Sequence, residues 1–525
     1  MDLERKIGQL IVAGFEGTEV NESIREMITK YHVGNIILFE HNCKTPEQIF
    51  KLTQDLQKIA LESNGVPLFI TIDQENGTVT RIYDGVTVFP GNMAQSAGAT
   101  VEETKQVGYF TGIGLKALGI NFNLAPSVDI NNNPNNPVIG VRSFGETRRQ
   151  VSERGNAFIC GLQETGVIAT AKHFPGHGDT CVDSHLDLPI VPHAKERLEQ
   201  IELYPFKKAI EKGVKAIMSA HIQFPGYEPT GLPATLSYQV LTKLLREELG
   251  FEGLIITDCM EMKAIDTHYG TAQAVPMAIG AGADLVCLSH TKQKQIDAIE
   301  EIYKALEKGV LTEERINQSV NRILKEKENY HAEDFLKISY EDTKKDLYQK
   351  EHENLAKKIS EKSITLIKND GSIPITAQDI LIIAPQGRVL TGADGTRVAP
   401  NFANFFAERI KDRHVETYEI DNMPTEKQML ELEEKCKYRE LIIFCTHNGG
   451  LAPKQIELAK RLLAINKRFI LIPMRNPYDS QLLIEVGCCV LPYEYTVHSM
   501  TSLIKVLMGN IRAEGKLPVR LNLRY

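Results

Sequence analysis

The 525-residue sequence predicts an α/β protein with two parts, a (β/α)8 barrel of the TIM type followed by a smaller α/β sandwich domain. Three observations support this prediction. Eight short β-branched runs alternate with amphipathic helical stretches up to about residue 290. These runs are apolar almost throughout, which is typical of parallel strands covered by helices on both faces. A charged helical stretch then precedes a second, shorter series of strand and helix patterns.

The eight strand-like runs follow one another in order along the first part of the chain. They cover residues 9–15, 35–40, 67–73, 119–130, 166–174, 214–222, 253–258 and 283–289. Stretches such as TPEQIFKLTQDLQKIALES lie between them and carry apolar residues at helical spacing. Each strand with its following helix is therefore read as one unit of the barrel. We expect the N-terminal segment MDLERKIG to lead directly into the first strand.

The predicted barrel covers residues 1–335, a helical linker covers residues 336–360, and the C-terminal α/β sandwich covers residues 361–525. The boundary follows from the charged helical pattern at about residues 293–355. Six further strand-like runs come after it: SITLIKND, DILIIAPQ, HVETYEI, LIIFCTH, RFILIPM and CCVLPYEY. No G-x-G-x-x-G fingerprint and no P-loop opens a helix in this second part, so the sequence gives no support for nucleotide binding.

Composition excludes several classes of partner. The formal net charge of −8 argues against a nucleic-acid partner, because binding to phosphate backbones needs a basic face. No apolar stretch approaches the roughly 18–20 residues that span a bilayer, and the N-terminus lacks the pattern of a secretory signal. The nine cysteines form no CxxC pair and are scattered, as in proteins with reduced thiols. We therefore expect a cytoplasmic protein with neither nucleic acid nor membrane as partner.

Ionisable residues stand where five of the predicted barrel strands end. They are Asp73, Asp129, the pair Lys172 and His173, His221, and Asp258. Because the carboxyl ends of barrel strands meet at one face, these residues are expected to ring the mouth of a pocket.

The densest group of such residues is AKHFPGHGDTCVDSHLDLP, at residues 171–189. Its glycines and proline indicate a loop that can approach a ligand closely. Asp183 lies two residues before His185, so its carboxylate can hold the imidazole tautomer and make the ring an acid/base. A metal site is the alternative, because the loop also offers a set of possible metal ligands. That set is His173, His177, Asp179, Asp183 and His185.

Asp258 ends the apolar run of GFEGLIITDCMEMKAI, where a carboxylate on a rigid strand faces a barrel pocket and can act as a nucleophile. The alternative is an N-cap of the helix that follows. Glu261 is a weaker candidate, since it is expected inside the following turn.

Asp73 and Arg81 lie in PLFITIDQENGTVTRI, and Arg142 lies in NPVIGVRSFGE. A carboxylate accepts two hydroxyl groups at once, and a guanidinium donates in a fork to oxygen atoms. These residues can therefore bind a polyhydroxylated ligand. An intrachain ion pair between Asp73 and Arg81 is the alternative, and Arg142 alone could be an ordinary surface residue.

Taken together, these motifs resemble glycoside hydrolase family 3, and within it the bacterial β-N-acetylglucosaminidases of the peptidoglycan-recycling kind. The resemblance rests on K-H-F-P-G-H-G at 172–178, D-S-H at 183–185, I-D-Q-E-x-G at 72–77, R-S-F at 142–144 and T-D-x-M at 257–260. It covers the barrel from end to end and the second domain more loosely.

The resemblance implies a retaining hydrolase that removes terminal β-linked N-acetylglucosamine from an oligosaccharide or muropeptide. In it Asp258 is the nucleophile, and His185 is the acid/base, oriented by Asp183. It further implies residues that hold the terminal sugar, namely Asp73, Arg81, Arg142, Lys172 and His173. No metal and no cofactor is implied, which sets the metal alternative aside.

Three other functions remain open at this point: a β-N-acetylglucosaminide phosphorylase, a broad β-glucosidase and a non-enzymatic sugar-binding protein. The chain departs from the usual family pattern at Asn76, Thr78 and Cys259, so the chemical identity of the leaving group is not fixed by the sequence. In the second domain, the loop His447-Asn448-Gly449-Gly450 follows a predicted strand and is a candidate for reaching the pocket.

Overall fold

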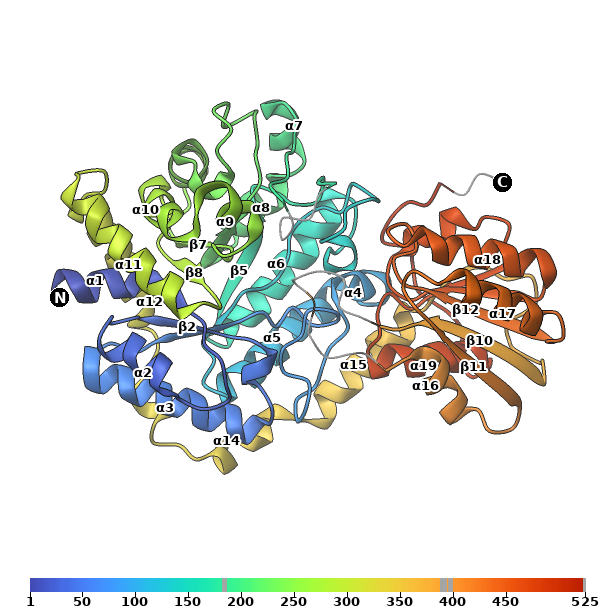
Figure 1. Cartoon of the computed structure of the whole chain (residues 1–525). Coiled ribbons are helices and arrows are strands. Elements are labelled where there is room, and N and C mark those ends of the chain that lie inside the picture. The colour runs from blue at the N-terminus through green and yellow to red at the C-terminus, as the bar shows by residue number, and fades with distance from the viewer. Residues whose placement is uncertain (182–186, 388–393, 395–399, 523–525) are drawn as a thin grey trace.

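In the computed structural model the chain forms two α/β parts that lie side by side (Figure 1). The structure describes the whole chain except residues 182–186, 388–393, 395–399 and 523–525. Asp183 and His185 therefore lie outside the described residues.

The first part is a barrel of eight parallel strands, as the sequence predicts. Neighbouring strands follow the order β7-β6-β5-β4-β3-β2-β1-β8, and a parallel bridge between Ile256 and Leu285 joins the two ends of this order. The strands are β1 (Ile11–Ala13), β2 (Asn35–Leu38), β3 (Phe69–Ile72), β4 (Phe122–Asn123), β5 (Ile168–Phe174), β6 (Ala216–Ser219), β7 (Leu254–Thr257) and β8 (Val286–Leu288). Every residue of these strands is buried, which explains why the runs are apolar without alternation.

Helices cover the outside of this barrel (Figure 1). They are α1 (Leu3–Leu10), α2 (Glu22–Thr29), α3 (Pro46–Asn64), α4 (Asn92–Gly98), α5 (Val101–Ala117), α6 (Arg148–Glu164), α7 (Lys195–Gln200), α8 (Tyr204–Glu211), α9 (Lys263–Tyr269), α10 (Thr271–Ala281), α11 (Lys292–Glu307) and α12 (Glu313–Lys327). A π-helical segment, Gln239–Glu248, covers the connection between β6 and β7.

The expectation that the N-terminal segment leads directly into a strand is wrong, because α1 precedes β1. The Asp2 side chain caps this helix by accepting a hydrogen bond from the Arg5 backbone N–H. Ile7 and Leu10 are fully buried, and the helix packs against α12 and α11. The strand itself begins only at Ile11.

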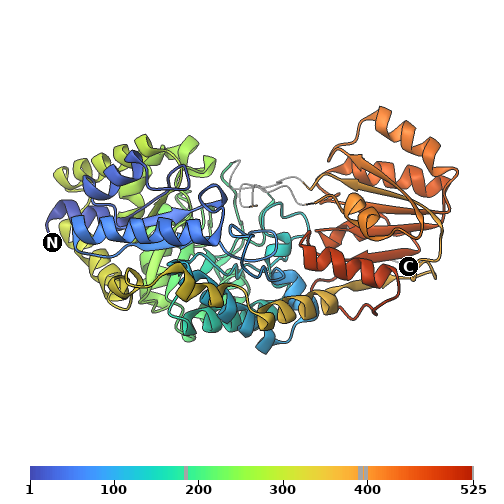
Figure 2. The same ribbon diagram turned by 90° about the horizontal axis from the view of Figure 1, so that it is seen from below.

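Three helices connect the two parts: α13 (Ala332–Phe335), α14 (Tyr340–Leu347) and α15 (Lys350–Ser363). The helix α15 contacts α4 and α5 of the barrel as well as α19 of the second part. It spans the space between the two parts in the view from below (Figure 2).

The second part is a six-stranded sheet with helices on both faces. The strand order is β11-β10-β12-β13-β14-β9, and all neighbours are parallel except β9, which is antiparallel to β14. The strands are β9 (Thr365–Lys368), β10 (Asp379–Pro385), β11 (His414–Ile420), β12 (Leu441–Thr446), β13 (Phe469–Pro473) and β14 (Cys488–Leu491). The helices are α16 (Phe402–Arg409), α17 (Glu426–Cys436), α18 (Pro453–Ile465) and α19 (Val497–Leu507).

The two parts share a buried apolar cluster. Met93, Ala94 and Ala97 of α4, together with Val141, pack in the same cluster as one face of the second sheet. Polar contacts accompany this packing: the Asn131 Nδ2 atom donates to the Tyr478 hydroxyl at 3.1 Å. The second domain is therefore held against the loops at the carboxyl ends of the barrel strands.

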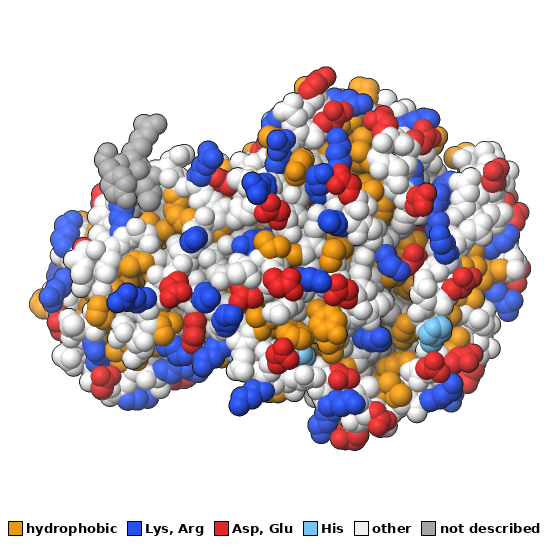
Figure 3. Space-filling view, turned by 180° about the vertical axis from the view of Figure 1, so that it is seen from behind, with side chains coloured by type: hydrophobic (Ala, Val, Ile, Leu, Met, Phe, Trp, Pro, Cys, Tyr) orange, Lys and Arg blue, Asp and Glu red, His pale blue; other side chains and the backbone are white. Residues whose placement is uncertain are grey.

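The surface carries both signs of charge. Basic and acidic side chains are interspersed over the face seen from behind, across both parts of the molecule (Figure 3). Of the described helices, none combines the length and the apolar character that a bilayer-spanning helix requires.

Candidate active site

A pocket of about 350 Å³ opens at the carboxyl ends of the barrel strands. Six residues selected from the sequence line it: Asp73, Arg81, Arg142, Lys172, His173 and Asp258. Lys172 and His173 lie in the last part of β5, and the others lie in segments that follow β3, β4 and β7, so the barrel fold brings together residues that are far apart in the chain.

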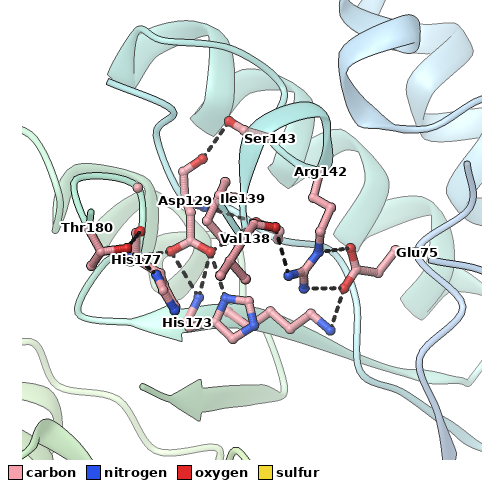
Figure 4. A network of polar contacts seen from close by, with 12 residues as sticks. Glu75, Asp129, Val138, Ile139, Arg142, Ser143, His173, His177 and Thr180 are labelled. Carbon is pink, nitrogen blue, oxygen red and sulfur yellow. Dashed lines mark hydrogen bonds and ion pairs between the residues drawn. The ribbon is translucent and has the colours of Figure 1, made fainter. Parts of the chain in front are cut away.

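Four charged side chains at this pocket form what we call the ion cluster: Asp73, Glu75, Arg142 and Lys172. The Lys172 Nζ atom lies 2.8 Å from Asp73 Oδ1 and 2.7 Å from Glu75 Oε1. Arg142 donates in a fork to both carboxylate oxygens of Glu75, at 2.8 and 3.0 Å (Figure 4). Lys172 thus bridges two carboxylates that both follow β3, and Arg142 pairs with one of them, Glu75.

Electrostatics keeps Glu75, Arg142 and Lys172 of the ion cluster charged. Burial acts to raise the pKa of Glu75, but the charges of Arg142 and Lys172 outweigh it and hold this pKa well below its ordinary value. Burial likewise acts to lower the pKa of Lys172, and the carboxylates of Asp73 and Glu75 raise it instead. Lys172 therefore offers a fixed positive charge to a ligand at every moderate pH.

Glu75 is the residue that sequence reasoning missed. Its side chain is 2% exposed, lines the pocket and is the carboxylate that fixes Arg142. It belongs to the I-D-Q-E-x-G motif and lies two residues after Asp73. With Asp73 as the single carboxylate for Arg142 and Lys172, one buried positive charge would lack a partner. This charge imbalance is the signal that could have pointed to Glu75.

For Asp73 and Arg81 the sequence left two alternatives, ligand binding and an intrachain ion pair, and the structure has features of both. The Arg81 Nη2 atom lies 3.7 Å from Asp73 Oδ2, and its guanidinium lies 5.8 Å from the Phe39 ring centroid. An intrachain ion pair therefore exists, yet both side chains also line the pocket. Asp73 keeps 16% of its side chain exposed, which leaves its carboxylate accessible to a ligand.

Asp129 does not line the pocket but orients two histidines that do. Its Oδ2 atom lies 2.7 Å from His173 Nδ1, and its Oδ1 atom accepts the His177 backbone N–H at 2.6 Å (Figure 4). Burial lowers the pKa of His177 to about 4, so this ring is neutral at physiological pH. The contact to Asp129 fixes a proton of His173 on Nδ1, so the Nε2 atom of the ring remains available to a ligand in the pocket.

Asp258 directly follows the last residue of β7 and lines the pocket. Its backbone N–H donates to Ser219 O at 3.2 Å, which holds the residue against β6. The helix α9 begins at Lys263 with Met262 as its N-cap, so Asp258 is not the cap of that helix. This observation removes the structural alternative that the sequence had left open.

Glu261, the weaker candidate, also lines the pocket, but its carboxylate is held by the next loop. The Oε1 atom accepts the backbone N–H groups of His290 at 2.7 Å and Thr291 at 3.1 Å. Glu261 therefore ties the loop after β8 to the loop after β7.

His221 has a structural contact instead of a place at the pocket. Its Nδ1 atom lies 2.9 Å from the Thr235 hydroxyl, and its Nε2 atom lies 2.9 Å from Cys259 O. Among the described residues, no group of three or more His, Cys, Asp or Glu side chains is arranged to hold a metal ion.

The glycine-containing loop of the second domain does not line the pocket in the described structure. Its backbone N–H groups at Gly449 and Gly450 donate to the carboxylate of Asp479, at 2.7 and 3.2 Å. The Thr446 hydroxyl donates to the same carboxylate at 2.6 Å. The Asp479 side chain thus occupies the N–H groups of this loop, to which an anionic group of a ligand could otherwise have bound.

Comparison with known proteins gives the family. The model of the glycosyl hydrolase family 3 N-terminal domain matches residues 2–325. The chain belongs to glycoside hydrolase family 3. Beta-hexosaminidase A of Pseudoalteromonas piscicida is 32% identical over 96% of this chain and 92% of that protein. The protein named beta-N-acetylglucosaminidase/beta-glucosidase from Cellulomonas fimi is 29% identical over 72% of this chain and 67% of that protein.

A solved structure supports the same conclusion at the level of the fold. The family 3 β-N-acetylglucosaminidase from Paenibacillus sp. str. FPU-7 covers 100% of this chain and is itself covered completely. The TM-score is 0.91 and the sequences are 40% identical. The resemblance seen in the sequence is confirmed, and the chain is a family 3 glycoside hydrolase whose relatives include β-hexosaminidases.

Proposed function

We propose that this family 3 enzyme is a retaining exo-β-N-acetylglucosaminidase. It removes terminal, non-reducing β-linked N-acetylglucosamine through a covalent glycosyl-enzyme on Asp258. The observation that carries the proposal is the position of Asp258 at the end of β7, in the same pocket as the ion cluster. The names of the relatives from Pseudoalteromonas and Paenibacillus support the choice of sugar.

The ion cluster and its neighbours suit a single sugar ring with several hydroxyl groups. The Asp73 carboxylate can accept from two hydroxyls, while Lys172, Arg142 and His173 can donate to ring substituents. A pocket of about 350 Å³ lies at the small end of the range for ligand sites. One terminal sugar residue fits such a volume better than the interior of a polysaccharide, which favours exo-action.

The proposed reaction has two steps. In the first, Asp258 attacks the anomeric carbon, and His185 gives its proton to the glycosidic oxygen as that bond breaks. In the second, His185 takes a proton from water, the water oxygen attacks the anomeric carbon, and the Asp258 carboxylate leaves. Asp183 holds the imidazole of His185 in the tautomer that both proton transfers need.

The proposed biological role is cell-wall or amino-sugar recycling in the cytoplasm. The family resemblance supports the role, and the scattered cysteines of the sequence support the compartment. The natural leaving group would then be an amino-sugar oligosaccharide or a muropeptide.

The test compares hydrolysis of 4-nitrophenyl N-acetyl-β-glucosaminide with that of the matching β-glucoside in the presence of EDTA. The wild type, Asp258→Ala and His185→Ala are assayed side by side. Preferential turnover of the N-acetylated substrate and severe impairment of both variants are expected. Loss of wild-type activity in EDTA, or equal turnover of both sugars, would contradict the proposal.

A second arm of the same assay decides between water and phosphate as acceptor. The products formed with and without inorganic phosphate are separated, and the proposal expects free N-acetylglucosamine in both cases. Accumulation of the sugar 1-phosphate would make the enzyme a phosphorylase that uses the same glycosyl-enzyme. The retained configuration is read from the anomer that appears first by NMR.

A further inference from the structure

Glu494 of the second domain is buried against the barrel. The residue follows β14, and its carboxylate is 2% exposed. The Oε2 atom accepts the backbone N–H of Gly91, which belongs to the barrel, at 2.7 Å. The Oε1 atom accepts the hydroxyl of Thr496 at 2.8 Å, which fixes the carboxylate on its own side.

Two barrel glycines make room for this carboxylate. A Cβ atom at Gly77 would lie 2.9 Å from Glu494 Oε2 and 2.5 Å from the Gly91 Cα. A Cβ atom at Gly91 would lie 3.2 Å from the same oxygen. Gly77 also has a φ of 60°, a conformation that favours glycine. The barrel backbone is thus shaped to admit the carboxylate.

A small cavity of about 10 Å³ connects Glu494 with the back of the ion cluster. Glu75 and Arg142 line it from the barrel, and Tyr493 and Glu494 line it from the second domain. Glu75 and Arg142 also line the large pocket. The pair therefore has the proposed sugar site on one side and Glu494 on the other.

The two segments next to Glu494 support Glu75 and Arg142 of the ion cluster. Gly77 lies two residues after Glu75, in the turn that leads from β3 to Arg81. Gly91 precedes Asn92, whose Nδ2 atom donates to the backbone carbonyl of Arg142 at 2.6 Å. One carboxylate thus touches both the turn behind Glu75 and the segment that holds the backbone of Arg142.

The backbone next to Glu494 adopts an unfavourable conformation. Tyr493 has a φ of 69°, which a bulky side chain rarely adopts. Its ring is 1% exposed, and its hydroxyl donates to Thr365 Oγ1 at 2.8 Å. Conformations of this kind persist where the surrounding structure imposes them and are frequent at functional sites.

From these contacts we infer that Glu494 is a positioning residue for the glycosidase reaction, by which the second domain sets the geometry of Glu75 and Arg142 in the sugar site. It does not touch the reacting atoms. It fixes the turn that follows Glu75 and the Gly91–Asn92 segment, which hydrogen-bonds to the backbone of Arg142. The inference rests on the proposed function, because it takes this pocket to be the sugar site.

The burial of Glu494 agrees with such a role. No lysine or arginine makes an ion pair with it among the described residues, and burial raises its pKa to about 7. The other ionisable side chains that line the small cavity are Glu75 and Arg142 from the barrel and Tyr493 from the second domain. A carboxylate so costly to bury is retained where its hydrogen bonds hold a neighbouring element in place.

The experiment measures kcat and KM for 4-nitrophenyl N-acetyl-β-glucosaminide, together with inhibition by N-acetylglucosamine, in Glu494→Ala and Glu494→Gln. Displacement of sugar-binding groups by a fraction of an ångström lowers kcat/KM by roughly tenfold to a hundredfold, so we expect that loss in Glu494→Ala. The loss appears mainly in KM, and product inhibition weakens in parallel. Glutamine can accept from Gly91 and donate to Thr496, so Glu494→Gln restores KM to within about threefold.

Two further variants make the result decisive. Arg520→Ala removes an exposed ion pair to Glu146 at 3.4 Å, another contact between the domains, and should leave both constants unchanged. Gly91→Ala should raise KM as Glu494→Ala does, because its Cβ atom displaces the carboxylate, and it serves if Glu494→Ala does not fold.

Unchanged KM and product inhibition in folded Glu494→Ala or Gly91→Ala would overturn the inference, even if the melting temperature falls. Equal damage by Ala and Gln would also overturn it. If the wild type does not turn over the N-acetylated substrate at all, the proposed function fails instead. The two failures are therefore distinguishable.

Discussion

At the scale of single residues, ion pairs within the ion cluster hold the lining of the proposed sugar site in place. Arg142 and Lys172 are almost completely buried, and each is compensated by a carboxylate that follows β3. A buried charge that loses its partner costs far more than the pair contributes when intact. Substitutions at different residues of the ion cluster should therefore lower the stability of the protein by very different amounts.

We predict that Glu75→Gln destabilises the protein by about 3–5 kcal/mol, because Arg142 loses its charged partner in the protein interior. Asp73→Asn should cost clearly less, because Glu75 still compensates both cations and the Asp73 side chain is 16% exposed. Denaturant unfolding of the two variants checks this order. An equal loss of stability would show that Glu75 is not the principal partner of Arg142.

A second residue-scale prediction concerns the proposed acid/base dyad. Asp183→Asn should lower kcat by about a hundredfold, because the acid/base imidazole loses the carboxylate that orients it. Asp187→Asn is the matched control on the same loop: its side chain is 68% exposed and contacts His268. The loss should be larger for a phenyl than for a 4-nitrophenyl leaving group, since the poorer leaving group needs the proton more. Equal effects of the two substitutions would contradict the assignment of Asp183.

The sequence predicted six of the pocket residues: five belong to motifs at or after the end of an apolar strand, and Arg142 was selected through the family resemblance. It could not predict how they are paired. Glu75 contacts Arg142 and Lys172, which are 67 and 97 positions further along the chain. Only the closure of the barrel brings these segments together, and local pattern carries no information about it.

At the scale of elements, α5 and α6 pack with unusually close backbones. A Cβ atom at Gly108 would lie 2.3 Å from the Phe158 backbone oxygen, and one at Gly161 would lie 2.0 Å from the Lys105 oxygen. The two helices therefore approach through glycines that face each other's backbone. Asn76 is linked to the same helix pair, since its Nδ2 atom donates to Thr111 Oγ1 of α5 at 3.1 Å.

This contact leads to a prediction with a control on the same helix. Gly108→Ala should destabilise the protein by about 1–3 kcal/mol, because α5 must move away from α6. Gly114→Ala has no atom within 4 Å of the new methyl group and should stabilise by about 0.5–1 kcal/mol through helix propensity. Thermal unfolding of both variants measures the difference. A stabilising effect of Gly108→Ala would show that the two helices are not in backbone contact.

The number and order of strands could be read from the sequence, and the structure has all eight of the first part and all six of the second. The N-terminal boundary could not. Gln9 and Leu10 fit the predicted strand because they precede the apolar run from Ile11 to Phe15, but the Asp2 cap and the burial of Ile7 and Leu10 on one face extend α1 through them. Capping and tertiary packing decided the boundary there.

At the scale of the whole molecule, stability depends on a carboxyl group shared by the two domains. The pKa of Glu494 rises from its ordinary value of 4.5 to about 7 on folding, so the folded state favours the protonated form. The corresponding stability is fully present below pH 4.5 and is lost as the pH rises through about 7.

We therefore predict that the wild type loses about 3 kcal/mol relative to Glu494→Gln between pH 4.5 and pH 7.5. The glutamine variant lacks the titrating group and keeps its hydrogen bonds, which makes it the reference for this comparison. Denaturant unfolding at a series of pH values gives the difference directly. A difference that stays constant with pH would show that the group titrates normally in the folded protein.

The apolar cluster shared by α4, Val141 and the second sheet has a consequence for any attempt to isolate the catalytic half. A fragment ending near residue 335 would present Met93, Ala94, Ala97 and Val141 to water, beside a turn no longer held by Glu494. Such a fragment would be prone to self-association, because an uncovered apolar patch next to loose loops invites contact between copies. An autonomous barrel with this active site would need polar replacements at those four positions and a new partner for the Gly91 amide.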